Sequence, residues 1–305
     1  MTSGPFHPGE LAVQRQAGVA AMASRIGNGI HDAIPPAAAD FLADRTWLVL
    51  ATTDAHGRPW ASVVSGPAGF ATVLEGIGGE SGVRLSTRPV QGDPLVANLG
   101  VARHVGLLAI DLRTRRRMRV NGRLVAASEE AIVLVADQVY SNCPKYIQRR
   151  VTDDPRAANG EAPTAVRAAA LTPEQREWIR MADTFFVGTT NPGEGADASH
   201  RGGAPGFVEV TGERIRWPDY PGNMMFNTLG NIESSGMAGL LFPDFATGRA
   251  LLVTGKARID WPARSGAAIE RAVELDVEEV VELAGVFPER LALLDYSPHL
   301  PKPAG

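Results

Sequence analysis

The chain has 305 residues, of which 44% are hydrophobic and 21% are charged, and its formal net charge at pH 7 is −4. This length predicts about two soluble domains, and the acidity argues against a nucleic-acid-binding protein, which needs a basic surface. The single cysteine excludes an internal disulfide, and because we find neither a membrane-spanning apolar run nor a signal-peptide pattern, we expect a cytoplasmic protein with no membrane partner.

The first half, in chain order, is predicted to alternate short helices and strands. Pro35 and Pro36 open a helix that ends near Asp44. The β-branched and aromatic run TWLVLATT then predicts a strand. A second strand, a helix, a hairpin and a closing strand with period-two hydrophobicity follow, around residues 61–62, 93–100, 106–123 and 132–136.

The second half repeats this order. Thr172, Pro173 and Gln175 form a helix-start signature of N-cap, first-turn proline and capping box. The run TFFVGTT predicts the next strand. Two further strands, a helix, a hairpin and a closing strand are expected around residues 198–199, 214–217, 223–234, 239–255 and 273–277.

Two blocks of identity indicate that the halves are copies of one domain. Segments 52–70 and 189–207 share Thr, Thr, Ala, Ser, Gly, Gly and Phe at equal spacing, and segments 106–122 and 239–255 share Gly, Leu, Leu, Asp, Thr, Arg, Val and Gly. An Ala-, Pro- and Gly-rich linker at 151–172 separates them. We therefore predict a first copy at 1–155, with an N-terminal helical extension, and a second copy at 165–305. Mainly antiparallel β-structure with short helices favours small barrels.

The glycine-rich segment 193–206 is the first candidate site. Its first residues fit a dinucleotide-binding pattern, but more glycines and Pro205 follow instead of a helix, which argues against that fold. As a strand, the segment places Asp197, Ser199 and Arg201 on one face, where a hydroxyl and a guanidinium suit a phosphate. An exposed arginine on a strand edge is an equal alternative. The first copy has Val64 at the position of Arg201.

A second candidate is the turn at 217–223, which leads into the helix predicted at 223–234. Free N–H groups at a helix start favour an anion. Simple capping by Asn223 is the alternative, but Asn227 and Asn231 add more amides than one cap requires.

The basic run 113–123 places four polar side chains on one strand face: Arg117, Arg119, Asn121 and Arg123. A solvated face explains most of them, although one or two could reach a phosphate or an acidic substrate. Cys143 has no histidine near it in sequence, so a buried cysteine is expected. The six histidines show no metal-binding spacing, and we predict no metal site.

These motifs resemble the pyridoxamine 5′-phosphate oxidase-like FMN-binding split-barrel family, in a tandem-domain form. The second copy resembles it through GADASHRGGAPGFVEV, PDYPGNMMFNTLGNI and GLLFPDFATGRALLVTGKARI, the first through GRPWASVVSGPAGF and GLLAIDLRTRRRMRVNGR, and HPGE and NCPKYIQRR resemble accompanying motifs. The resemblance implies two split β-barrels, FMN as cofactor and a homodimer. It also implies that the isoalloxazine ring faces Asp197, Ala198, Ser199 and His200. The family's Arg-Lys pair is replaced by Asn223-Met224-Met225, which leaves Arg201 or a distant residue to supply charge.

The function expected on this basis is an FMN-dependent oxidoreductase that transfers hydride at flavin N5. Its partners would be a small-molecule substrate and a reduced nicotinamide or other electron donor. Candidate catalytic residues are Lys145, Tyr146 and His200. The predicted cofactor-binding residues are Asp197, Ala198, Ser199, His200, Arg201, Tyr220, Gly222, Asn223 and Asn227. A non-catalytic flavin or haem carrier on the same fold is the alternative, and the first copy could be a degenerate structural half.

Overall fold

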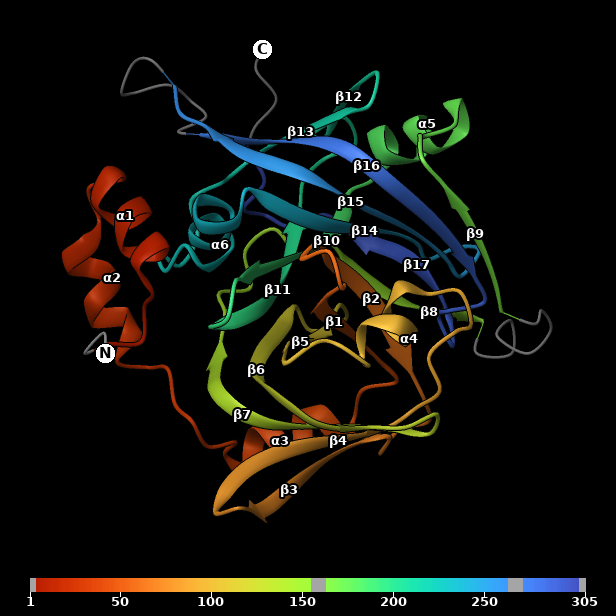
Figure 1. Ribbon diagram of the computed structural model, residues 1–305. Coiled ribbons are helices and arrows are strands. Elements are labelled where there is room, and N and C mark those ends of the chain that lie inside the picture. The colour runs from red at the N-terminus through yellow and green to blue at the C-terminus, as the bar shows by residue number, and fades with distance from the viewer. Residues whose placement is uncertain (1–3, 155–162, 263–270, 302–305) are drawn as a thin grey trace.

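A computed structural model describes residues 4–154, 163–262 and 271–301. The chain forms two large antiparallel sheets, drawn one above the other in Figure 1, with the N-terminal helices at one side. The first copy comprises α1 (Pro8–Gln16), α2 (Ala20–Gly27), α3 (Pro36–Ala43), β1 (Trp47–Thr53), β2 (Pro59–Ser65), β3 (Ala71–Ile77), β4 (Glu80–Ser86), α4 (Pro94–Asn98), β5 (His104–Asp111), β6 (Arg116–Ala127) and β7 (Ala131–Ser141).

The second copy follows after two short strands, β8 (Arg149–Asp154) and β9 (Thr164–Ala168). It comprises α5 (Pro173–Met181), β10 (Thr184–Asn191), β11 (Gly195–Gly202), β12 (Glu209–Thr211), β13 (Arg214–Pro218), α6 (Asn227–Ser235), β14 (Met237–Asp244), β15 (Arg249–Asp260), β16 (Ala272–Ala284) and β17 (Arg290–Asp295). The expected mainly β architecture with short helices is confirmed.

The two sheets have the same strand order, which supports the duplication read from the sequence. The first runs β2-β1-β5-β6-β7-β4-β3 and the second runs β11-β10-β14-β15-β16-β13-β12. The register repeats as well, since Ala51 pairs with Gly106 and Gly188 pairs with Gly239. Both long hairpins have an irregularity of register at the same place, before Gly122 and before Gly255.

The domain limits at 155 and 165 stay predictions, and residue 155 lies outside the described residues. The ends of the copies interleave here: β17, from the end of the chain, pairs with β8, and β9 extends the second sheet by pairing with β16.

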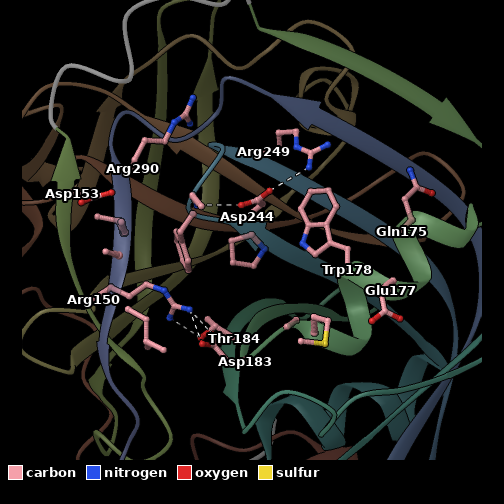
Figure 2. A pocket seen from close by; sticks show the side chains of 18 of the residues that line it. Arg150, Asp153, Gln175, Glu177, Trp178, Asp183, Thr184, Asp244, Arg249 and Arg290 are labelled. Atoms are coloured by element: carbon pink, nitrogen blue, oxygen red, sulfur yellow. Dashed lines mark hydrogen bonds and ion pairs between the residues drawn. The ribbon is translucent and has the colours of Figure 1, made fainter.

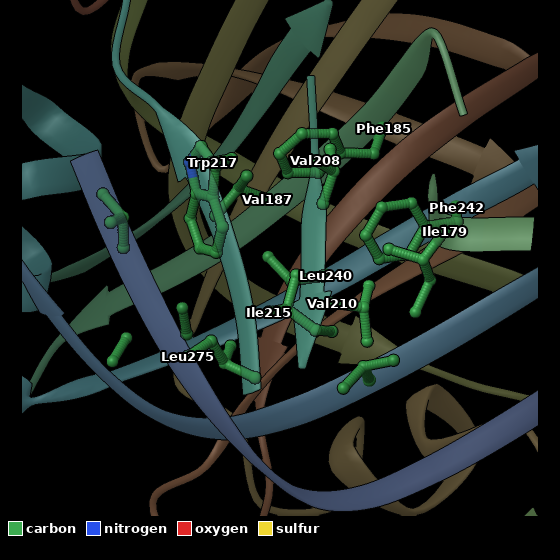
Figure 3. Packing of buried hydrophobic residues seen from close by; sticks show 14 of the residues in the cluster. Ile179, Phe185, Val187, Val208, Val210, Ile215, Trp217, Leu240, Phe242 and Leu275 are labelled. Atoms are coloured by element: carbon green, nitrogen blue, oxygen red, sulfur yellow. The ribbon is translucent and has the colours of Figure 1, made fainter. Parts of the chain in front are cut away.

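The second copy packs its core inside its own sheet. Figure 3 shows Phe185, Trp217 and Phe242 in this cluster. The Phe185 ring stacks on Phe242 at 5.1 Å between centroids and meets Trp217 edge-on at 5.5 Å, which are favourable aromatic geometries. A separate cluster fills the first copy, and a third joins the copies through residues such as Trp47, Phe186 and Leu252.

The copies pack against each other reciprocally, and two glycines make this possible. A Cβ on Gly106 of β5 would lie 2.7 Å from the Asp197 Cα of β11. At the equivalent place, a Cβ on Gly239 of β14 would lie 2.8 Å from the Trp60 Cα of β2. Each β5-type strand therefore approaches the β2-type strand of the other copy closely enough that only glycine fits. The chain thus contains a pseudo-two-fold interface between its two copies.

Substitution of Gly239 by alanine is expected to lower the melting temperature by about 2–5 °C, because overpacking of a dense interface costs roughly 1–3 kcal/mol. Thermal unfolding followed by circular dichroism measures the change. Gly195→Ala is the matched control, since a Cβ there meets no atom within 4 Å. Equal melting temperatures for the two variants would show that the copies do not pack in this way.

Candidate functional site

The polar face of β11 lies against the first copy and is buried by it. Asp197 accepts hydrogen bonds from Asn121 Nδ2 at 2.6 Å and from Asn231 Nδ2 at 2.8 Å. Ser199 Oγ accepts from Arg119 at 2.6 Å and lies 2.7 Å from the Thr228 hydroxyl. The predicted common face of Asp197 and Ser199 is present, and its partners come from β6 of the first copy and from α6.

Three arginines from both copies gather beside this face. Arg117 and Arg119 lie on β6 and Arg201 lies near the end of β11. The Nε atoms of all three are buried and have no hydrogen-bond partner among the described residues. Burial, followed by repulsion from Arg119 and Arg201, lowers the pKa of Arg117 to about 9. The cluster is therefore short of negative charge.

The acidic groups nearest to the cluster are already engaged. Arg119 Nη1 lies 3.5 Å from the Asp197 carboxylate, which also accepts the two amide bonds described above. Arg201 lies 3.6 Å from Asp219, but Asp219 is bound more closely by Arg271, at 2.7 Å. An incoming anion would find free N–H groups here in a site of low dielectric constant.

A small, partly open space of about 60 Å³ lies at this cluster. Five of the predicted cofactor-binding residues line it: Arg201, Tyr220, Gly222, Asn223 and Asn227. Arg119, a first-copy residue, also lies in the wall, as does Asp219. The structure thus brings together the predicted phosphate-binding residues with an arginine that we did not include among them.

The segment between β13 and α6 corrects one expectation. The helix begins at Asn227 instead of at Asn223, and the Asn223 side chain accepts a hydrogen bond from the Met225 N–H. The delay has a backbone cause, because Met224 and Phe226 adopt left-handed conformations, with φ of 61° and 62°, that interrupt a helix. Any anion here would meet turn N–H groups instead of a helix start, and backbone strain of this kind clusters at functional sites.

His200 and Ala198, also among the predicted residues, are buried within the interface. His200 Nδ1 lies 3.2 Å from Arg117, and its Nε2 has no partner among the described residues. Burial, together with Arg117 and Arg201, holds the pKa of His200 well below its ordinary value, so the ring is neutral. A neutral, enclosed imidazole is poorly suited to donate protons to a substrate at neutral pH.

Tyr146 reaches the edge of the same space from the first copy. Its ring lies 5.2 Å from the Tyr220 ring, and its hydroxyl donates to the Pro221 carbonyl at 3.0 Å. Tyr146 has a positive φ of 66°, and of the four non-glycine residues with positive φ in the described chain, three lie at this site. Lys145, the neighbouring candidate, is half-buried and does not line the space.

The pseudo-two-fold relates the arginine cluster to a second place between the copies, where apolar side chains replace Arg119 and Arg201. Strand alignment puts Val64 where the second copy has Arg201, and Leu252 where the first copy has Arg119. Ser62, the equivalent of Ser199, donates to the Asp93 carboxylate at 2.7 Å, and Asp93 caps α4. The pseudo-two-fold therefore relates the polar arginine cluster to a place occupied by the apolar side chains of Val64 and Leu252.

The N-terminal helix α1 closes the polar site from another side. His7 and Glu10 form a capping box, and Glu10 accepts from Asn227 Nδ2 at 2.5 Å. Burial, followed by the neighbouring Asp197, raises the pKa of Glu10 to about 8. The sequence identified HPGE as an accompanying motif of the family. That its Glu10 contacts Asn227 is visible only in the tertiary structure.

The largest described cavity, of about 870 Å³, lies elsewhere and shares no residue with the arginine cluster. Figure 2 shows two ion pairs among its charged side chains, Arg150 with Asp183 and Arg249 with Asp244. Arg150 binds Asp183 at 2.6 Å, and Arg249 lies 3.3 Å from Asp244. Arg290, which also lines this cavity, has a buried Nη1 without a partner among the described residues. We place the candidate site at the arginine cluster because five of the predicted cofactor-binding residues gather there.

Comparison with known proteins supports the family resemblance. Residues 34–166 match a family model described as pyridoxamine 5′-phosphate oxidase. This match agrees with the family resemblance that the sequence motifs predicted. The match falls on the first copy, whereas the more specific motifs were read in the second. No curated protein matches the chain.

Several solved structures share partial likeness. A putative pyridoxamine 5′-phosphate oxidase from Lactobacillus delbrueckii is 17% identical, with a TM-score of 0.30, and covers 36% of this chain and 93% of its own. An FAD-binding protein from Mycobacterium smegmatis is 12% identical (TM-score 0.25; 39% and 98%). HutZ, the haem storage protein from Vibrio cholerae, is 18% identical (TM-score 0.24; 36% and 94%). Within the described residues, no helix is long and apolar enough to cross a membrane.

Proposed function

We propose that the chain binds FMN with its phosphate in the arginine cluster and acts as an FMN-dependent oxidoreductase. The observation that carries this proposal is a cluster of three arginines whose buried Nε atoms have no partner among the described residues, two of which, Arg119 and Arg201, line one small space. Buried donors without acceptors are costly, and a phosphate offers acceptors in the geometry that guanidinium groups prefer.

The residues fit the phosphate end of the cofactor. The space of about 60 Å³ is far below the roughly 300–1,000 Å³ of pockets that enclose whole cofactors. Only the phosphate would be enclosed, and the half-buried Tyr220 and Tyr146 rings at the edge would offer aromatic surface to the rest. Asp197, Ser199 and His200 would then support the arginines from behind instead of facing the ring.

Each residue has a distinct role in this proposal. Arg119 and Arg201 would supply charge and N–H donors, which compensates for the absence of the family's Arg-Lys pair at Asn223. Ser199 positions Arg119 through its 2.6 Å hydrogen bond. Bound FMN would supply hydride transfer at N5. Because Leu252 and Val64 fill the equivalent place, we propose one FMN per chain.

The phosphate assignment is tested by comparing FMN with riboflavin, which lacks the phosphate. For the ligand-free protein, titration followed by flavin fluorescence is expected to give about tenfold or greater preference for FMN. Arg119→Met should abolish the preference while riboflavin binding is retained. Arg123→Met is the matched control, because Arg123 lies on the same strand but is exposed and pairs with Asp137 and Glu80. Unchanged preference in Arg119→Met would contradict the assignment.

Catalysis is tested separately by anaerobic mixing of the FMN-loaded protein with reduced nicotinamides. Bleaching of the flavin absorbance would support an oxidoreductase, and no bleaching by any donor would favour the flavin-carrier alternative. A Soret band in place of a flavin spectrum would favour haem. The electron donor, the homodimer and the cytoplasmic location stay predictions.

A further inference from the structure

A second polar cavity, of about 230 Å³, lies where the N-terminal segment meets both copies. It is lined by residues before and within α1, by β6 and β7 of the first copy, and by the turn from β10 to β11. It shares no lining residue with the arginine cluster. Nothing in the proposed flavin site accounts for it.

Asn121, in the wall of this cavity, has a side-chain oxygen that accepts no hydrogen bond from the described residues. Its Nδ2 donates to Asp197 at 2.6 Å and lies 3.3 Å from Gln138 Oε1. Because the carboxylate of Asp197 accepts, the amide nitrogen must face it, which fixes the orientation of Asn121. The Oδ1 atom is buried and has no partner among the described residues, and Asn121 is only 5% exposed. A donor supplied by a ligand would satisfy it.

The rest of the wall is acidic. Four acidic side chains line the cavity, those of Glu10, Asp137, Glu194 and Asp197, and the described lining residues include no lysine or arginine. Asp137 and Asp197 have arginine partners that reach them from outside the lining. Glu194 accepts from the Asn191 amide, and Glu10 accepts from the Asn227 amide and a backbone N–H. Both carboxyl groups have neutral hydrogen-bond partners only, and because burial raises the pKa of Glu10 to about 8, Glu10 is largely protonated at pH 7.5 when no ligand is bound.

Two histidines line the cavity, His7 and His104, and the one that contacts the buried network, His7, supplies no positive charge. His7 Nε2 donates to Asn231 Oδ1 at 2.9 Å, since the Asn231 amide nitrogen is directed at Thr189 and Asp197. His7 Nδ1 accepts from the Gly9 N–H at 3.2 Å. The ring therefore acts as one donor and one acceptor, which is the neutral form, and burial lowers its pKa accordingly.

We propose that this cavity binds the ammonium group of a small organic amine. An ammonium carries three donors, one for the free Asn121 oxygen and others for the Glu194 carboxylate and the Glu10 carboxyl oxygens. Among the described residues, no three His, Cys, Asp or Glu side chains converge closely enough to hold a metal ion. The wall therefore suits a hydrogen-bonding organic cation better than a metal.

The test uses the full chain and three probes of equal size: propylamine, 1-propanol and propionate. Isothermal titration at pH 7.5 is expected to detect binding of propylamine alone. Glu194→Gln should weaken that binding at least fivefold, because it removes a carboxylate that attracts the ammonium group. Glu194 is exposed in a loop, so the substitution should leave folding intact. Asn121→Leu should weaken it similarly. Glu129→Gln, an exposed carboxylate at a distant hairpin, is the matched control and should bind as the parent chain does.

Equal binding of 1-propanol, unchanged binding by Glu194→Gln, or stoichiometric binding of Mg²⁺ in place of the amine would overturn the proposal. If Asn121→Leu fails to fold, Glu194→Gln decides the matter alone. FMN affinity is measured on the same samples and should be unchanged in Glu194→Gln. A loss of amine binding with FMN binding intact therefore concerns this cavity only.

Discussion

Arg201→Val is expected to raise the melting temperature of the ligand-free protein by several degrees and to lower its affinity for FMN about tenfold or more. Arg201 is half-buried next to Arg117 and Arg119, and its Nε atom is buried and has no partner among the described residues. Replacing a poorly compensated buried charge by an apolar side chain is commonly neutral or stabilising, by up to about 1–4 kcal/mol. Valine is the residue that the first copy has at this position.

Arg271→Met provides the contrast for this prediction. Removal of Arg201 leaves Asp219 with its close ion pair to Arg271, at 2.7 Å. Removal of Arg271 leaves Asp219 with the longer ion pair to Arg201, at 3.6 Å. Loss of Arg271 should therefore destabilise the chain, because it weakens the compensation of a buried carboxylate. Differential scanning fluorimetry without flavin measures both variants. A drop in melting temperature for Arg201→Val would show that Arg201 is a structural residue.

The second large effect concerns the pH dependence of stability through Glu10. Burial and Asp197 raise the pKa of this carboxyl to about 8 from an ordinary value of 4.5. The folded chain therefore holds a proton that the unfolded chain has lost between these two pH values. The free energy of unfolding consequently falls as pH rises through this window and levels off above it. Below pH 4.5 both states are protonated and the effect disappears.

Glu10→Gln should remove this dependence. The variant is expected to gain several degrees in melting temperature over the parent chain at pH 8.5, and little at pH 4.5, since each unit of pKa shift corresponds to about 1.4 kcal/mol. The difference between the two chains isolates Glu10, because His7, Asp197 and Arg119, which face it, are present in both. Glu129→Gln controls for the loss of one surface charge. A constant difference across pH 4.5–8.5 would contradict the raised pKa.

Much of the fold was predictable because its signals are local. Strands such as Thr184–Asn191 follow from β-branched and aromatic runs, and the capping box of Thr172 and Gln175 marks the start of α5 as expected. The duplication was readable because both copies retain glycines at the same places, Gly106 and Gly239 among them. The backbone packing between the copies admits only glycine there.

Only some residues of the candidate site could be predicted from the sequence. Arg201 lies in the glycine-rich segment 193–206 and Tyr220 lies in the turn at 217–223, and the sequence identified both segments as candidate sites. Arg119 was read mainly as part of a solvated basic face, because its alternation along β6 says nothing about what covers that face. The start of α6 was placed too early, since left-handed residues such as Met224 carry no reliable sequence signal.

The sequence by itself determined that the chain is a duplicated, mainly β protein and that the second copy holds the polar segments. Only the tertiary structure decided that the first copy supplies Arg117 and Arg119 to the second copy's site. The physical reason is that residues some 80 positions apart meet only when two sheets pack through close backbone contact. Local patterns specify which residues share a strand face, whereas the packing of the copies specifies which faces meet.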